Sequence, residues 1–263
     1  MIKVLFIGDV CGQLGRKAVD KFVPELKRKY EVDLVLTNAE NVAHGRGVTV
    51  KTVNYLMSSG VDYMTTGNHI WKNPEFEEVL SGDFPVIRPI NYPSDVIGSG
   101  FAEIDLGAKG VFLLVSVMGM AFFNERTLTE PFRALESFFS EIDTDKYSGI
   151  LIDFHAEATA EKLSAGLYFD GRVSAIVGTH THVPTADETI LPNGTAYITD
   201  VGMSGPMDSV LWVKKEAIFK QNMYPYPVYF DIQEDGSARF DAVLIEIESA
   251  KKAVNITRIN KIL

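Results

Sequence analysis

The sequence has very little cysteine: Cys11 is the only one among 263 residues, so no disulfide can form within the chain. A lone cysteine is typical of proteins in a reducing compartment, and the apolar run at residues 2–7, followed closely by Asp9, is too short for a signal peptide. No apolar stretch approaches the ~20 residues that a membrane-spanning helix needs. We therefore expect a cytoplasmic protein without a membrane partner.

Basic residues are also scarce, since 25 Lys and Arg face 35 Asp and Glu and leave a formal net charge of -10. Proteins that hold nucleic-acid backbones carry a basic surface, so this charge disfavours a polymeric nucleic-acid substrate. The 46% of hydrophobic residues suffices for a core and excludes a disordered chain. Because α/β folds of this length commonly form one unit, we expect residues 1–263 to be a single domain.

Short apolar runs alternate with longer amphipathic segments through most of the chain. The expected strands are residues 4–7, 34–36, 63–65, 111–117, 149–154 and 173–177. The expected helices are residues 18–29, where apolar side chains recur every three or four positions, and residues 48–57, 132–142 and 158–167. This alternation predicts parallel strands covered by helices.

The pattern changes near Thr189, after which strand-like pieces are joined by turns. We expect one hairpin between residues 190–191 and 196–198, and a second between residues 228–232 and 239–247 around Glu234-Asp235-Gly236. An α/β beginning followed by an antiparallel tail predicts two packed sheets with helices outside. It disfavours an eightfold barrel, whose βα alternation would persist to the end.

Polar motifs follow several of the expected strands, and four of the five histidines lie in them. The motifs are Gly8-Asp9, Asn38-Ala39-Glu40-Asn41, Gly67-Asn68-His69, Asp153-Phe154-His155 and Gly178-Thr179-His180-Thr181-His182. In open α/β sheets the carboxyl ends of parallel strands converge on one crevice, where residues far apart in sequence share a ligand. One site could hold all five motifs.

The candidate ligands in these motifs offer oxygen and imidazole nitrogen and no thiolate: Asp9, Glu40, Asn41, Asn68, His155, His180 and His182. This mixture suits Mn, Fe, Zn or a similar divalent ion better than a soft-metal cluster. Seven ligands are too many for one tetrahedral ion and fit two ions that share a carboxylate. His180 and His182 can both reach such a pair if the backbone between them stays extended.

Two divalent ions with only two anionic ligands would leave excess positive charge, so the centre would attract an anion. Two ions ~3.5–4 Å apart can clamp a phosphoryl group and hold a hydroxide in line with phosphorus. The residues therefore predict phosphoester hydrolysis. An amidohydrolase-type enzyme also uses His-x-His, but on an early barrel strand, whereas His180 and His182 come late in the chain.

The series of motifs resembles the calcineurin-like metallophosphoesterase superfamily, and most closely its bacterial YmdB family. The resemblance covers essentially the whole chain, and its most specific element is Gly178-Thr179-His180-Thr181-His182-Val183-Pro184-Thr185-Ala186-Asp187. It implies a metallophosphoesterase-type four-layer α/β/β/α sandwich, with two mixed sheets flanked by helices. The chain departs from the general superfamily at Asp9-Val10-Cys11, where Asp-x-His is usual, and at Ala39-Glu40-Asn41, where Gly-Asp is usual.

The resemblance also implies roles for the candidate ligands. Asn41 looks like the ligand that compensates for the missing histidine, and Glu40 looks like the bridge between the ions. One ion would be held by Asp9, Glu40, Asn41 and His182, and the other by Glu40, Asn68, His155 and His180. The ions would be Fe or Mn, with Zn and Mg as alternatives. His69 would stay free of metal and protonate the leaving oxygen.

The function implied is a metal-dependent phosphodiesterase in which a metal-bridging hydroxide attacks a small phosphodiester, a 2′,3′- or 3′,5′-cyclic nucleotide. The alternatives are a phosphomonoesterase or nucleotidase of the same superfamily, and a regulator that binds a nucleotide without hydrolysing it. His44 and Arg46 follow Glu40 and Asn41 in a glycine-rich loop, which favours either a substrate contact or a solvated loop. The resemblance also makes a homo-oligomer reasonable.

Three further features have more ordinary interpretations. Cys11 is interpreted as a small buried hydrophobe rather than a nucleophile, because no base is identifiable for it. Arg88 is interpreted as structural, and residues 200–205 as a loop that supports the histidines or contacts substrate. We expect the aromatic series Tyr224, Tyr226, Tyr229 and Phe230 to belong to the core or to a subunit contact rather than to a platform on which bases stack.

Overall fold

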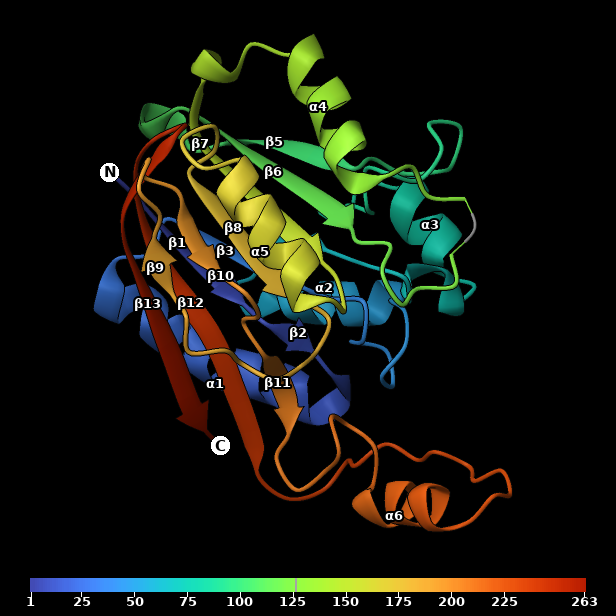
Figure 1. Ribbon diagram of the computed structural model, residues 1–263. Coiled ribbons are helices and arrows are strands. Elements are labelled where there is room, and N and C mark those ends of the chain that lie inside the picture. The colour runs from blue at the N-terminus through green and yellow to red at the C-terminus, as the bar shows by residue number, and fades with distance from the viewer. Residues whose placement is uncertain (126) are drawn as a thin grey trace.

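Two mixed β-sheets form the centre of the fold in the computed structural model, which describes residues 1–125 and 127–263 (Figure 1). The first sheet follows the order β2 (Asp9–Val10), β11 (Met203–Pro206), β12 (Ala238–Ser249), β1 (Ile2–Ile7), β3 (Leu34–Asn38) and β4 (Tyr63–Thr65), with β13 (Lys252–Ile262) beside β12. The second follows the order β5 (Phe101–Asp105), β6 (Val111–Met118), β7 (Tyr147–His155), β8 (Ala175–Thr179), β10 (Ala196–Ile198) and β9 (Thr189–Ile190). Parallel pairing joins β1 to β3, β3 to β4, β6 to β7 and β7 to β8.

Helices cover the outer faces of both sheets. Helices α1 (Gly12–Tyr30), α2 (Val50–Ser58) and α3 (Phe76–Ser81) pack against the first sheet. Helices α4 (Pro131–Glu141) and α5 (Thr159–Tyr168) pack against the second. The remaining helical elements are α6 (Lys215–Met223) and the 3-10 turns η1 (Ile70–Lys72), η2 (Gly107–Lys109) and η3 (Thr144–Lys146).

Three apolar clusters separate four layers. Val4 and Phe6 of β1 join a cluster that also contains Phe112 of β6, between the sheets. Leu5 and Ile7 point the other way, into the cluster beneath α1 and α2, because successive side chains of a strand face opposite sides. A third cluster lies between the second sheet and helices α4 and α5. The four-layer α/β/β/α sandwich expected from the sequence is confirmed.

The hairpin expected between residues 228–232 and 239–247 is wrong. The strand β12 pairs instead with β1 on one side and with β13 on the other, so no edge of it remains for residues 228–232. Pro225 and Pro227 precede that segment, and proline cannot donate a hydrogen bond to a strand ladder. The other expected hairpin is confirmed, since β9 and β10 pair antiparallel.

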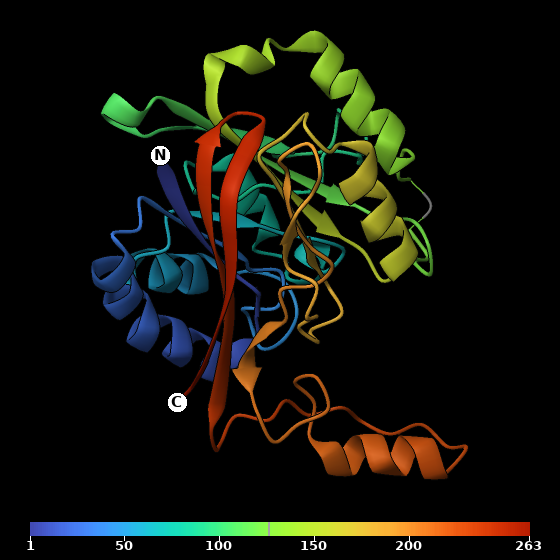
Figure 2. The ribbon, with the colours of Figure 1, turned by 60° about the vertical axis from the view of Figure 1, so that its left-hand side comes forward.

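Residues 207–237, called the arm from here on, connect β11 to β12 and extend away from the sandwich (Figures 1 and 2). Helix α6 lies in the arm and has no buried residue. Tyr224, Tyr226, Tyr229 and Phe230 are exposed there, so the expectation of a core role is wrong. A subunit contact through these side chains stays a prediction.

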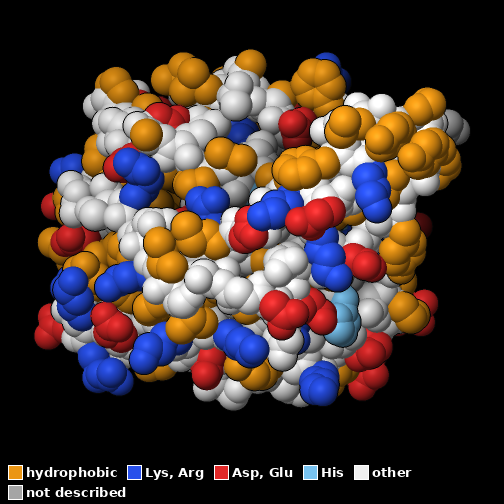
Figure 3. Space-filling model, turned by 90° about the horizontal axis from the view of Figure 1, so that it is seen from below, with side chains coloured by type: hydrophobic (Ala, Val, Ile, Leu, Met, Phe, Trp, Pro, Cys, Tyr) orange, Lys and Arg blue, Asp and Glu red, His pale blue; other side chains and the backbone are white. Residues whose placement is uncertain are grey.

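Seen from below, lysine and arginine side chains are interspersed with aspartate and glutamate and do not gather into one basic area (Figure 3). Among the described residues, no helix is long and apolar enough to cross a membrane.

Arg88 has the structural role expected for it. It is buried, and its guanidinium donates to the backbone carbonyl oxygens of Pro89, Pro93, Val96 and Ile97. These bonds fix the loop that leads from β4 towards β5.

A buried ion pair ties α5 to the loop after β10. Nζ of Lys162 lies 2.7 Å from Oδ2 of Asp200, and both side chains are 1% exposed. The same carboxylate accepts from the backbone N–H and the hydroxyl of Thr181, between two candidate ligands. Residues 200–205 therefore support the histidine motif through Asp200.

We predict that Lys162→Met lowers the free energy of unfolding by ~3–5 kcal/mol, because it leaves the Asp200 carboxylate buried without its cation. Urea-induced unfolding measures the loss. The matched control is Lys251→Met, which removes an exposed pair with Asp145 and should cost less than ~1 kcal/mol. Equal small losses in the two variants would contradict the structural role of the buried pair.

Candidate metal centre

The strand ends bring the candidate ligands together at one edge of the sandwich. Asp9 follows β1, Glu40 and Asn41 follow β3, and Asn68 follows β4, all in the first sheet. His155 ends β7 and the loop with His180 and His182 follows β8, both in the second sheet. The structure therefore assembles one cluster from both sheets. Metal binding by these seven residues stays a prediction.

Glu40 lies at the centre of the cluster. It is fully buried, and its Oε1 lies 3.3 Å from Nε2 of His155 and 3.3 Å from Nδ1 of His69. Its Oε2 accepts from the backbone N–H of His69 at 2.9 Å. Burial alone would raise the pKa of Glu40, but the two imidazoles lower it below its ordinary value. The carboxylate is therefore anionic and positioned between several donor groups.

One group of donors contains Asn68, His155 and His180. Nε2 of His155 lies 3.3 Å from Oδ1 of Asn68 and 3.1 Å from Nδ1 of His180. Ligand atoms of Glu40, His155 and His180 all lie within 4.8 Å of one another. Burial, together with the nearby His155, lowers the pKa of His180 to about 3, so its imidazole is neutral. Burial would lower the pKa of His155, but the carboxylate of Glu40 raises it. Imidazole nitrogens beside a carboxylate are donors that a divalent cation takes in exchange for any proton they carry.

The second group contains Asp9, Asn41 and His182. Nε2 of His182 lies 3.5 Å from Oδ1 of Asp9 and 3.2 Å from Nδ2 of Asn41. Oδ1 of Asp9 is buried and has no hydrogen-bond partner in the described part of the chain. A buried anionic oxygen is stabilised by a cation, and a metal ion would meet Oδ1 of Asp9 more closely than the imidazole of His182 does at 3.5 Å, so this group fits a metal ion.

Asn41 also contacts His69, and this contact bears on the role of both residues. Its Oδ1 accepts from Nδ1 of His69 at 2.6 Å, while its Nδ2 faces Glu40 and His182. Binding of an ion through Oδ1 therefore requires the amide to turn. The hydrogen bonds of His69 involve its backbone N–H and Nδ1, which leaves Nε2 as the ring nitrogen available to a substrate. Burial lowers the pKa of His69.

The backbone at the His-x-His motif differs from the expected extended strand. Strand β8 ends at Thr179, and the φ angles of His180 and His182 are 97° and 64°. Left-handed backbone is costly for residues other than glycine and concentrates at functional sites, where surrounding contacts hold it. The two side chains consequently separate, since His180 faces His155 and His182 faces Asp9.

Two supporting contacts orient the histidines, and sequence reasoning missed both. Nδ1 of His155 lies 2.9 Å from the hydroxyl of Thr179, which donates to Oδ1 of Asp153 at 2.6 Å. Sγ of Cys11 lies 3.8 Å from Nδ1 of His182. Such partners fix which nitrogen of a ligating histidine faces the ion. Cys11 is fully buried, and burial raises the pKa of its thiol, as the interpretation of a buried thiol requires.

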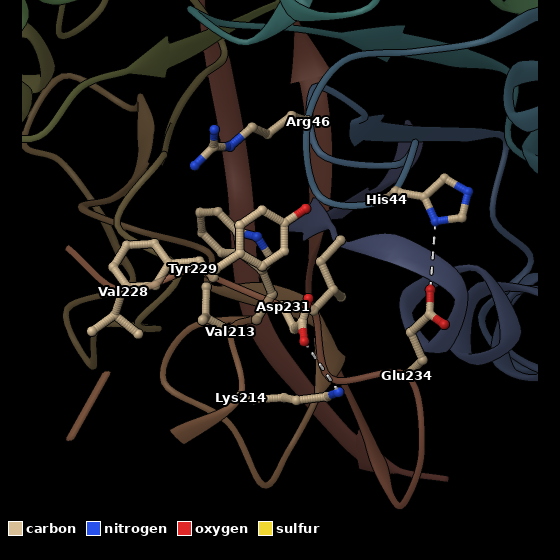
Figure 4. Close-up of a pocket in the computed structure, with 11 residues that line it drawn as sticks. His44, Arg46, Val213, Lys214, Val228, Tyr229, Asp231 and Glu234 are labelled. Carbon is tan, nitrogen blue, oxygen red and sulfur yellow. Dashed lines mark ion pairs between the residues drawn. The ribbon is translucent and has the colours of Figure 1, made fainter. Parts of the chain in front are cut away.

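His44 and Arg46 lie outside the cluster, at its border with the arm. They line a cavity of about 680 Å³ whose other wall includes Trp212 and Tyr229 (Figure 4). Trp212 also contacts His69 and was missed, because a tryptophan in a segment without periodicity gives no signal in the sequence.

Comparison with known proteins decides the family. A family profile described as YmdB-like protein matches residues 5–259. The chain belongs to the YmdB-like family. This confirms the resemblance drawn from the motifs.

Relatives of this YmdB-like chain include curated and solved proteins. A 2′,3′-cyclic-nucleotide 2′-phosphodiesterase of Bacillus subtilis is 43% identical, over 98% of this chain and 96% of the relative. A structure of a hypothetical protein from Thermus thermophilus has a TM-score of 0.91 and 40% identity, covering 99% of each chain. A structure described as a novel phosphatase from Mycoplasma pneumoniae has a TM-score of 0.92 and 34% identity, covering 99% of this chain and 93% of the other.

We predict that Asp9→Asn lowers the metal content of the purified protein from about two equivalents to about one or fewer, because it removes the negative charge of the carboxylate whose Oδ1 makes no hydrogen bond in the described part of the chain. Elemental analysis measures the content. Added Mn²⁺ should raise the unfolding temperature of the unchanged protein more than that of the variant.

The matched control is Asp20→Asn on the exposed face of α1, which should keep the metal content of the unchanged protein. Full metal content in Asp9→Asn would contradict the assignment of Asp9 as a ligand.

Proposed function

We propose that the protein is a metal-dependent phosphodiesterase that hydrolyses a small cyclic nucleotide at a dinuclear centre. The observation that carries the proposal is the buried carboxylate of Glu40, which contacts Asn41 of one donor group and His155 of the other. A carboxylate shared by two sets of oxygen and nitrogen donors is suited to bridge two divalent ions. The Bacillus subtilis relative is described as a 2′,3′-cyclic-nucleotide 2′-phosphodiesterase, which supports a 2′,3′-cyclic nucleotide as the substrate.

The residues define how the ions would be held. Asp9, Asn41 and His182 would hold one ion, Asn68, His155 and His180 the other, and Glu40 both. Iron or manganese fits this donor set, and zinc or magnesium is the alternative. When bound, two such ions supply positive charge for the phosphoryl oxygens and an attacking hydroxide at neutral pH.

The side chains around the centre would position the substrate and move a proton. His69 lies beside the candidate ligands Glu40 and Asn41, and its Nδ1 is held by the oxygen of Asn41. Its Nε2 can therefore protonate the leaving oxygen of the ester. The lowered pKa makes the protonated ring a stronger acid towards a ribose alkoxide.

Two alternatives remain distinct hypotheses. The description of the Mycoplasma pneumoniae structure as a phosphatase favours a phosphomonoesterase. Preference for p-nitrophenyl phosphate over bis(p-nitrophenyl) phosphate would support it. The other is a regulator that binds a nucleotide at the centre without hydrolysing it.

We predict that His69→Ala lowers kcat for 2′,3′-cyclic AMP by roughly 10²–10⁴-fold, the usual contribution of a general acid. The loss for bis(p-nitrophenyl) phosphate should be much smaller, because p-nitrophenolate departs without a proton. Steady-state kinetics with both substrates measures this difference.

The control for His69→Ala is its metal content, which should equal that of the unchanged protein. Equal losses with both substrates would assign His69 a structural role and contradict the proton transfer. Nucleotide binding without turnover in the metal-loaded unchanged protein would overturn the proposed activity in favour of the regulator.

A further inference from the structure

The cavity of about 680 Å³ lies between the loop of residues 43–47 and the arm (Figure 4). Volumes of roughly 300–1,000 Å³ are typical of small-molecule sites. The loop begins two residues after Asn41, so one wall of the cavity is continuous in sequence with the candidate ligands.

Trp212 connects this cavity to the metal centre. Its ring lies 4.7 Å from that of His182 and 6.4 Å from that of His69, measured between centroids. Its indole also packs on the backbone of Gly45, where a Cβ atom would lie 2.6 Å from Nε1. A phosphoester held at the centre would therefore reach the cavity directly past Trp212.

Aromatic side chains form much of the wall that the arm contributes. Tyr229 is 85% exposed and Phe230 is also exposed, and both line the cavity with Trp212. The base of the arm is held together by backbone hydrogen bonds from Gln233 to Trp212 and from Lys214 to Asp231. These bonds join the two ends of the segment that carries Tyr229 and Phe230 beside the cavity.

The charged groups of the cavity are mostly paired with one another. Lys214 lies 3.7 Å from Asp231, and His44 lies 3.4 Å from Glu234. Arg46 differs, because its guanidinium makes neither an ion pair nor a hydrogen bond within residues 1–125 and 127–263.

Arg46 follows the candidate ligand Asn41 by only five residues and lines the cavity. In Figure 4 its side chain projects into the space above Tyr229. A guanidinium presented in this way is suited to a phosphate or to the face of a base.

We propose that this cavity binds the nucleoside part of the substrate, with the base against Tyr229 and Arg46 beside the phosphate-bearing ribose. The inference rests on the proposed function, which places the ester at the metal centre. Aromatic faces stack on any base. The cavity would therefore favour substrates that carry a base, with little preference for which base it is. The arm is then a specificity element of the enzyme.

The test compares 2′,3′-cyclic AMP with 1-O-methylribose 2,3-cyclic phosphate, which has no base. In Tyr229→Ala the kcat/KM for 2′,3′-cyclic AMP, divided by the kcat/KM for the ester without a base, should fall roughly 5- to 100-fold. The main cause should be a higher KM for the nucleotide. Tyr229→Phe keeps the ring and should restore the ratio. The matched control is Tyr226→Ala, an exposed tyrosine of the arm outside the cavity, which should stay within about twofold of the unchanged protein.

A second readout does not depend on turnover. The chain has two tryptophans, so Trp71→Phe leaves Trp212 as the only one. Titration of that protein with adenosine 3′-monophosphate should quench the fluorescence of Trp212. Addition of Tyr229→Ala should shift the titration to higher nucleotide concentration.

Three results would overturn the inference. The first is that Tyr229→Ala has the same ratio of kcat/KM values as the protein without the substitution, and that this protein hydrolyses both esters. That result would overturn the inference and leave the proposed function intact. Tyr229→Ala could instead alter only the sedimentation of the protein, which would assign the aromatic wall to contact with a second copy. Failure of the unchanged protein to hydrolyse either ester, with no quenching of Trp212, would overturn the proposed function together with this inference.

Discussion

The buried carboxylate of Glu40 is the group around which the rest of the site is arranged. An ionised carboxylate without solvent is costly unless positive charge and hydrogen bonds surround it. His69 and His155 approach it from the two sheets. Gly67 makes room for the contact of His155 with Glu40, because a Cβ atom there would lie 2.2 Å from the His155 ring and 2.6 Å from Oε2 of Glu40. The packing of the two sheets therefore brings to Glu40 the imidazoles that its buried negative charge requires.

Polar contacts behind the ligands explain how loops hold a centre of this kind. Asp153 lies in β7, is fully buried, and receives the hydroxyl of Thr179, so the orientation of His155 is fixed from within the sheet. The carboxylate of Asp200, in the loop after β10, accepts a hydrogen bond from the backbone N–H of Thr181. A buried polar network with unpaired groups would be less stable than an apolar core, whereas a fully hydrogen-bonded network favours a single arrangement of its side chains. These contacts hold the loop in which His180 and His182 adopt left-handed backbone.

The sequence predicts the sandwich and the assembled cluster because both depend on local patterns. Apolar alternation and helical periodicity identify the strands and helices, and each ligand motif follows a strand whose carboxyl end must reach the same edge. The arm lacks such signals: α6 has no apolar face, and Pro225 and Pro227 interrupt the strand-like run before residue 228. The contact of Cys11 with His182 joins positions 171 residues apart, which only the folded chain brings together.

In the proposed function, the centre performs the hydrolysis and the cavity recognises the nucleoside, and the two lie in different parts of the fold. The candidate ligands belong to strand ends and their adjoining loops, where buried neighbours on both sides resist displacement. The aromatic wall belongs to the arm, whose helix buries nothing and whose backbone is held mainly at its base by the pairing around Trp212. Few contacts constrain the residues of such a segment, so they can change without disturbing a rigid scaffold. A chain built in this way can alter the molecule it accepts while the arrangement around Glu40 stays fixed.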